Sequence, residues 1–141
     1  MEQNIWEYDD FIFKGDELKG MTAKGKDKVK AGGQTDLVIP AVTPDGLPLK
    51  KIADNAFYRR GLTSVVIPDT VESIGYDAFG VCKLKEVKLP EALVNIEGFA
   101  FYRNKLTKVE FGSKVKRIEP SAFAMNELSE ITLPETLEYI G

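Results

Sequence analysis

The chain has 141 residues, of which 43% are hydrophobic and 29% are charged, and its formal net charge at pH 7 is -3. This composition is typical of a single folded soluble domain. No apolar run approaches the length of about 18 residues that a membrane-spanning helix needs, so we expect no membrane insertion. The acidic balance gives no general attraction for phosphates, so we expect no nucleic-acid partner.

The residue types that carry most catalytic and metal chemistry are scarce in this chain. It has no histidine and a single cysteine, Cys82. Histidine is the commonest general base and the commonest metal ligand. No Ser/His/Asp set can form, and no glycine-rich phosphate loop follows a predicted strand. We therefore expect no catalytic residue, no metal and no cofactor.

Residues 1–33 do not repeat and are predicted to form an N-terminal cap of a hairpin and a short helix. Residues 11–21 alternate between apolar and polar side chains around a Gly-Asp pair, which predicts the β-hairpin. Thr22 is a suitable N-cap for the helix, although Gly25 lowers its helix propensity. Such a segment is expected to cover the apolar end of the repeat array that follows.

Residues 34–61 resemble the later repeats but contain an insertion. Six extra residues lie between Pro40 and Leu49, and they include a Pro-Asp-Gly turn signal centred on Asp45. We expect a first repeat with a protruding loop. Insertions in repeat arrays often carry binding, which makes Asp45 a candidate partner-binding residue. The alternative is that the loop is only a tolerated surface insertion.

From Leu62 to the end the sequence repeats every 22 residues without a shift in register. The copies begin at four equivalent leucines: Leu62, Leu84, Leu106 and Leu128. The last copy is half complete at Gly141. A fixed period in the twenties is typical of a solenoid in which each copy packs on the next. The array is therefore predicted to span residues 34–141.

Spacing within a copy predicts its local structure. In the first complete copy, Val65-x-Ile67 alternates and predicts a strand, which Pro68 ends. Val71 and Ile74 fit a second, short extended or turn-like segment, and the Ala-Phe pair that follows fits a 3₁₀ or single helical turn. Stacked copies are expected to pair each strand with its equivalents above and below, about 4.8 Å away.

The repeat pattern LxxVxIPxxVxxIGxxAF resembles the BspA-like, treponemal-type leucine-rich repeats of bacterial surface proteins. The resemblance covers residues 33–141 and rests on the proline, the Ala-Phe pair and a corner residue before each new leucine, namely Cys82, Asn104 or Asn126. It implies a right-handed superhelix with a parallel β-sheet and 3₁₀ or helical turns on the other face. It also implies a secreted or cell-surface protein with a role in adhesion. The chain shows no secretory signal and no wall anchor, which is consistent with a fragment.

The solvent-facing positions of the predicted strands form the first candidate binding surface. One column of this strand face consists of Val38, Val66, Lys88, Glu110 and Thr132. In the next column Glu86 is expected to face Lys108, which in turn faces Glu130. Alternating charge of this kind fixes the register and neutralises the face, so we do not expect it to trap ions.

Two other features carry alternative interpretations. Tyr58-Arg59 and Tyr102-Arg103 occupy the same columns two copies apart and could anchor a partner, or could shield the adjacent phenylalanines. Cys82 could be a reactive thiol, or could fill the corner that asparagine fills in the next two copies. The second interpretation is favoured because no histidine is present to activate the thiol.

The sequence therefore predicts a non-catalytic adhesion module that binds a partner protein or a glycan on a rigid repeat face. The alternative is a structural spacer or stalk in a larger surface protein, with no ligand of its own. The last copy leaves Leu133, Leu137 and Ile140 without a following copy, which predicts end-to-end self-association.

Overall fold

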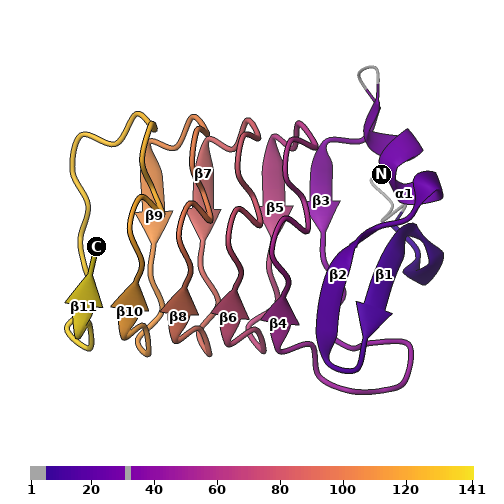
Figure 1. The fold of residues 1–141 in the computed structure, drawn as a ribbon, viewed down its shortest axis with the longest axis horizontal. Coiled ribbons are helices and arrows are strands. Elements are labelled where there is room, and N and C mark those ends of the chain that lie inside the picture. Colours follow the sequence, from indigo (N-terminus) through magenta and orange to yellow (C-terminus); the bar gives the residue numbers. More distant parts are fainter. Residues whose placement is uncertain (1–5, 31–32) are drawn as a thin grey trace, which may run out of the picture.

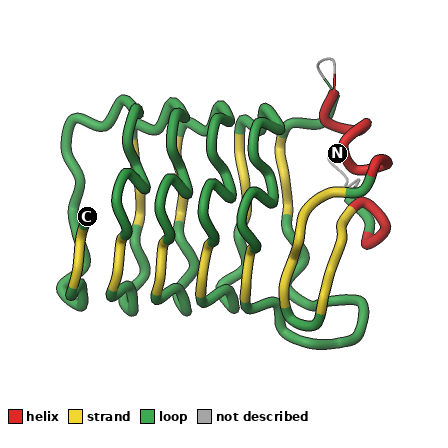
Figure 2. Tube along the Cα trace, viewed as in Figure 1, coloured by secondary structure: helices red, strands yellow, loops and turns green. Residues whose placement is uncertain are grey.

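The computed structural model describes residues 6–30 and 33–141. The repeats stack side by side along one axis, and a hairpin and a helix lie at the N-terminal end of the stack (Figure 1). Each turn is mostly loop, with short strands on two sides (Figure 2). The predicted cap of residues 1–33 includes residues 1–5 and 31–32, which lie outside the described part.

The N-terminal elements attach directly to the solenoid. They are a 3₁₀ helix η1 (Tyr8–Asp10), strands β1 (Phe11–Lys14) and β2 (Glu17–Met21), and helix α1 (Ala23–Val29). β1 and β2 form an antiparallel hairpin, in which Phe11 faces Met21. β2 also pairs in parallel with β4 (Lys51–Ile52) of the first repeat, so the hairpin continues the solenoid sheet.

Two columns of short strands run along the array. The first column contains β3 (Asp36–Val38), β5 (Ser64–Val66), β7 (Glu86–Lys88) and β9 (Lys108–Glu110). The second column contains β4, β6 (Ser73–Ile74), β8 (Asn95–Ile96), β10 (Arg117–Ile118) and β11 (Tyr139–Ile140). The second column, together with the hairpin, forms one seven-stranded sheet in the order β1-β2-β4-β6-β8-β10-β11.

The prediction of continuous pairing in the first column was wrong. Only β3 with β5 and β7 with β9 form ladders, and residues 130–132 of the last copy are not in a strand. The isoleucines of β4, β6, β8 and β10 are all buried. In the first column, Leu37 and Val87 are buried and Val65 and Val109 are only partly buried. The segment predicted to be short and extended or turn-like builds the continuous sheet.

The turns after the second column also differ from the prediction. In the described part of the chain, η1 is the only 3₁₀ helix. In the repeats, the amide of each buried phenylalanine instead donates to the next copy; for example, Phe79 N–H donates to the carbonyl of Ala100 at 2.8 Å. Each complete copy accommodates this ladder with two residues of positive φ, such as Asp77 (55°) and Val81 (54°).

The core follows the repeat columns. Phe57, Phe79 and Phe101 are fully buried and stack along the array, with 5.3 Å between successive ring centroids. The alanine before each phenylalanine is also buried, as at Ala78 and Ala100. The predicted inward direction of this Ala-Phe pair is thereby confirmed.

Replacing Gly25 with alanine is expected to destabilise the chain by about 1–3 kcal/mol, because α1 packs closely on η1. A Cβ atom at Gly25 would overlap the carbonyl oxygen of Asp10. In an unpacked helix the same change would stabilise by about 1 kcal/mol. Urea unfolding followed by the fluorescence of Trp6, the chain's one tryptophan, measures the effect in the cap itself. Asp27→Ala, in the same helix, is the control, and a gain in stability for Gly25→Ala would contradict the packing.

Candidate functional site

The predicted binding column on the strand face is divided into three parts. Val38 and Val66 face each other across the β3–β5 ladder, and their exposed fractions are 37% and 59%. Lys88 faces Glu110 across the β7–β9 ladder. Thr132 is exposed and lies outside any strand. The structure therefore joins these residues pairwise and does not place all five on one sheet.

The charges of the strand face follow the predicted register only between β7 and β9. Glu86 faces Lys108 there, as expected. The expected pairing of Lys108 with Glu130 is absent, because the last copy has no strand at this position. Lys108 instead lies 3.5 Å from Glu110 of its own strand, between the Nζ and Oε1 atoms. Both side chains are exposed, so this contact adds little stability.

Two hollows open beside the exposed valines. One, of about 310 Å³, lies at the break between β5 and β7 and is lined by Val65, Val66, Ile67, Pro68, Asp69 and Lys88. The other, of about 260 Å³, lies where the cap meets β3 and is lined by Trp6, Glu7, Tyr8, Phe11, Val38 and Pro40. Neither was predicted from the sequence. The second exists because the cap folds over β3, where the Trp6 indole N–H donates to the carbonyl of Asp36 at 2.9 Å.

The inserted loop forms an ordered turn. Val42 bridges to Pro48, and the amide of Thr43 donates to the carbonyl of Leu47 at 2.8 Å. The Tyr8 hydroxyl donates to the carbonyl of Val42 at 2.9 Å and ties the loop to the cap. Asp45 is exposed at the tip of the loop. The loop lies beside the hairpin end of the molecule (Figure 1).

The two Tyr-Arg pairs lie at the turns that end their copies, and they differ in detail. The guanidinium of Arg59 lies 5.3 Å from the ring centroid of Tyr58, and its Nε donates to the tyrosine hydroxyl at 2.9 Å. Tyr102 instead packs edge-on against Phe99, with 5.0 Å between ring centroids, and Arg103 is exposed. These pairs are separate from the exposed valines of the strand face.

The corner residues form a structural network. The Asn104 amide donates to the carbonyls of Phe79 (2.9 Å) and Phe101 (3.1 Å), and its Oδ1 accepts from the amide of Leu84 at 3.1 Å. Cys82 occupies the equivalent corner, and its thiol donates to the carbonyl of Phe57 at 3.3 Å. Burial raises the pKa of the Cys82 thiol above its ordinary value. A buried thiol with a raised pKa is a poor nucleophile, which supports the structural interpretation.

Replacing Cys82 with asparagine is expected to raise the free energy of unfolding by about 1 kcal/mol. The amide would supply the corner with stronger hydrogen bonds than the weakly donating thiol. The corner already holds asparagine in the next two copies, Asn104 and Asn126, so the backbone suits it. Urea unfolding of Cys82→Asn beside Cys82→Ala measures the gain. If the asparagine variant is no more stable than the alanine variant, the first corner differs from the others.

Two kinds of feature are absent from the described residues: a cluster that could hold a metal ion and a helix that could span a membrane. No group of three or more His, Cys, Asp or Glu side chains in residues 6–30 and 33–141 is placed to hold a metal ion. Within the same residues, no helix has the length and apolarity required to cross a bilayer. The geometry provides instead a rigid surface with two shallow hollows and exposed valines.

Stacked short repeats, a parallel sheet and a continuous column of buried isoleucine and phenylalanine define the fold as a leucine-rich repeat solenoid. A family model described as the BspA type leucine rich repeat region (6 copies) matches residues 50–141, and the chain belongs to this family. No curated protein matches the chain.

Two solved structures are similar to this chain. A leucine-rich repeat protein of T. pallidum superposes with a TM-score of 0.80 at 27% sequence identity, covering 94% of this chain and 62% of that protein. The chain thus spans less than two thirds of that relative. A leucine-rich repeat protein of Bacteroides capillosus is also similar, with a TM-score of 0.49 at 25% identity, covering 94% of this chain and 88% of that one.

Proposed function

We propose that the chain is a non-catalytic interaction and adhesion module of a bacterial surface protein, which binds a partner protein or glycan on its strand face. The observation that carries this proposal is the pair of exposed valines, Val38 and Val66, adjacent across one ladder and flanked by two hollows. Membership of the BspA-type family supports an interaction scaffold. Surface location and adhesion rest on the resemblance of the repeats to those of bacterial surface proteins.

The physical reason is the rigidity of the face. Each valine contributes up to about 1.5–3 kcal/mol when a partner buries it completely, and here only the exposed part of each is available. Because the strands are held by the stacked repeats, little conformational entropy is lost on binding. Lys88 and Glu110, in the neighbouring ladder, would form a polar rim beside this apolar centre.

The proposal is tested by probing two sets of ligands with the whole chain. One set is a panel of purified bacterial and host surface proteins, and the other is a glycan array. We expect saturable binding to at least one member, and at least tenfold weaker binding for the double variant Val38→Asp, Val66→Asp. Tyr76→Asp is the control, because Tyr76 is an exposed apolar residue at the turn after β6, away from the strand face. If nothing binds saturably, or if the control is equally impaired, the strand face is not a binding site and the spacer alternative is favoured.

Other surfaces belong to the proposal in secondary roles. Asp45 and its ordered loop would extend the contact at the cap end, and Thr132 would do so at the other end. The exposed side chains of the last copy, such as Leu133 and Ile140, would mediate end-to-end association. Sedimentation velocity over a range of concentrations measures this association directly.

A further inference from the structure

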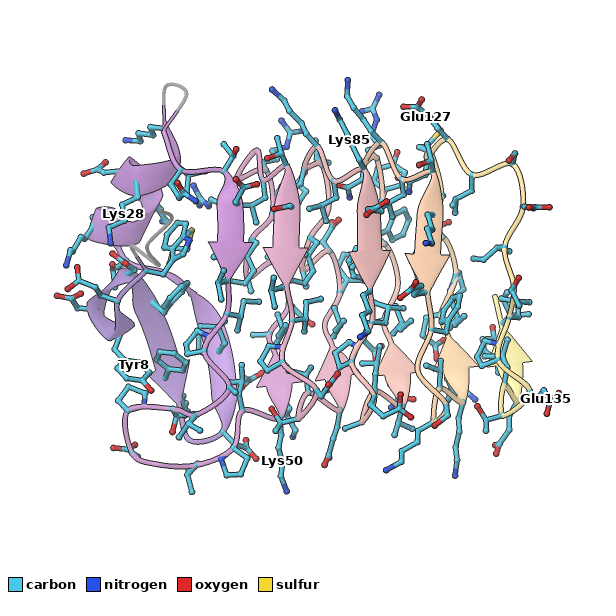
Figure 3. The ribbon with its side chains drawn as sticks, turned by 180° about the vertical axis from the view of Figure 1, so that it is seen from behind. Tyr8, Lys28, Lys50, Lys85, Glu127 and Glu135 are labelled. Carbon is cyan, nitrogen blue, oxygen red and sulfur yellow. The ribbon has the colours of Figure 1, made fainter. Side chains whose placement is uncertain are left out.

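The turns that join one copy to the next follow one long edge of the solenoid. We call this the linking edge, and it comprises residues 59–63, 81–85, 103–107 and 125–129. Backbone hydrogen bonds hold its residues in columns: Lys83 N–H donates to the carbonyl of Leu62 at 2.8 Å, and Lys105 N–H donates to that of Leu84 at 2.9 Å. Figure 3 labels Lys85 and Glu127 on this edge, and Lys50 and Glu135 on the opposite edge.

Positive charge gathers on the linking edge. Its basic residues are Arg59, Arg60, Lys83, Lys85, Arg103 and Lys105. Lys26 of α1 and Lys30, which directly follows α1, extend the row, because they line a hollow of about 270 Å³ together with Arg59 and Arg60. These eight residues are a large share of the 19 basic residues of a chain whose net charge is -3. The linking edge therefore has a local positive potential that the negative net charge of the chain does not indicate.

This row has few close ion pairs, and the Asp77 carboxylate interacts with Arg59 only at longer range. Among the described residues, only one of the eight has a carboxylate within 4.0 Å: Lys30, whose Nζ lies 3.3 Å from Asp27 Oδ1. Glu127, at the far end, is the one acidic residue of the linking edge. The opposite edge is mixed, with Glu72, Glu91, Lys114 and Lys116 among its residues. Unpaired cations that repel one another along a row are stabilised by an anionic partner.

The side chains beside the cations indicate the chemistry of this partner. The guanidinium of Arg59 lies 5.3 Å from the ring centroid of the half-buried Tyr58, and Arg103 follows the half-buried Tyr102 in the sequence. A guanidinium binds sulfate or phosphate oxygens with two parallel hydrogen bonds, and an aromatic face packs against the C–H face of a sugar ring. Successive turns are about 4.8 Å apart, so one flexible chain can contact several of them.

We propose that the linking edge binds a linear sulfated polysaccharide, with the arginines and lysines contacting its sulfates. The basic row ends at Glu127, and Glu86 directly follows Lys85 in the sequence. A nucleic-acid duplex laid across it would meet these carboxylates as well as the basic row. A thin, flexible polyanion can follow the basic row without contacting these carboxylates. This surface is separate from the strand face, so the two proposals succeed or fail independently.

The test measures heparin binding by the whole chain, using isothermal titration calorimetry at several salt concentrations. The double variant Lys83→Glu, Lys105→Glu is expected to bind at least tenfold more weakly, and its log-log salt slope should become shallower by about 1–2, because two phosphate-like contacts are lost. The matched control is Lys114→Glu, Lys116→Glu, which makes the same charge change on the opposite edge and should alter affinity less than threefold. Urea unfolding checks that both variants remain folded.

Three comparisons determine the outcome. Hyaluronan, which has carboxylates but no sulfates, should bind much more weakly than heparin. Arg103→Lys, which keeps the charge but removes the guanidinium fork, should weaken heparin binding severalfold. If oligothymidylate of similar length binds more tightly than heparin, the ligand is nucleic acid and the proposal is overturned. It is also overturned if heparin does not bind at low salt, or if the control variant loses as much affinity as the linking-edge variant.

Discussion

Replacing Phe101 with alanine is expected to lower the free energy of unfolding by about 3–5 kcal/mol. The ring is fully buried and stacks between Phe79 and Phe123, with centroid distances of 5.3 and 5.4 Å. The cavity left behind cannot close easily, because the backbone here is fixed by a ladder in which Phe101 N–H donates to the carbonyl of Ala122 at 2.8 Å. The total free energy of unfolding of a native protein is typically about 5–15 kcal/mol, so this loss would be a large share of it.

The position of Phe101 in the array adds a second expected effect. In a solenoid each copy contacts only its neighbours, so a weak central interface lets the two sides unfold separately. The apparent m-value of urea unfolding should therefore fall in Phe101→Ala. Phe123→Ala is the control. The Phe123 ring is only partly buried, so its removal should lower the free energy of unfolding less and leave the m-value closer to that of the parent chain. A loss below about 1 kcal/mol for Phe101→Ala would contradict the stacked core.

The repeat period predicted the core because burial repeats with it. Once the copies are aligned, Phe79 and Phe101 share one inward column, and the structure buries both. The strand pairing could not be predicted in the same way. Ser64–Val66 and Glu86–Lys88 have the same alternating pattern, yet no ladder joins them. Which of the two strand columns forms the continuous sheet is a property of the assembled stack, and the pattern within a single copy does not encode it.

The candidate surfaces illustrate the same limit. The exposure of Val38 and Val66 follows from alternation along a strand and was predicted. The hollows beside them depend on the missing ladder and on the position of the cap, and no local motif signals either. The repeat pattern does not reveal the linking edge, because its cations belong to different columns, such as those of Arg60 and Lys83. They form one row only when neighbouring turns are placed side by side.

Replacing Asn104 with alanine is expected to lower the free energy of unfolding by about 2–4 kcal/mol, although no apolar core atom is removed. The substitution leaves the buried amide of Leu84 and the carbonyl of Phe79 without their side-chain partner, while the carbonyl of Phe101 keeps the hydrogen bond from the Asn126 amide at 2.9 Å. Each unsatisfied buried group costs about 1–3 kcal/mol, and partial hydration at this edge recovers some of the loss. Urea unfolding of Asn104→Ala beside Asn104→Cys gives the measurement. The cysteine variant should lose less, because Cys82 fills the same corner in the preceding copy.

Replacing Asn104 with aspartate keeps the size of the side chain but changes its hydrogen-bonding groups, so it tests the hydrogen bonds separately from the packing. Asn104→Asp keeps the acceptor for the Leu84 amide but turns the donor into a carboxylate oxygen facing two carbonyls. Repulsion and burial should raise the pKa of this carboxyl in the folded chain above its unfolded value. Near pH 7 the variant is therefore expected to be at least as unstable as Asn104→Ala. As the pH falls through the raised folded pKa toward the unfolded one, the acid is protonated in the folded state, donates one hydrogen bond and regains stability relative to Asn104→Ala. If the difference between the two variants does not change with pH, the corner amide does not hold the turns together through these carbonyls.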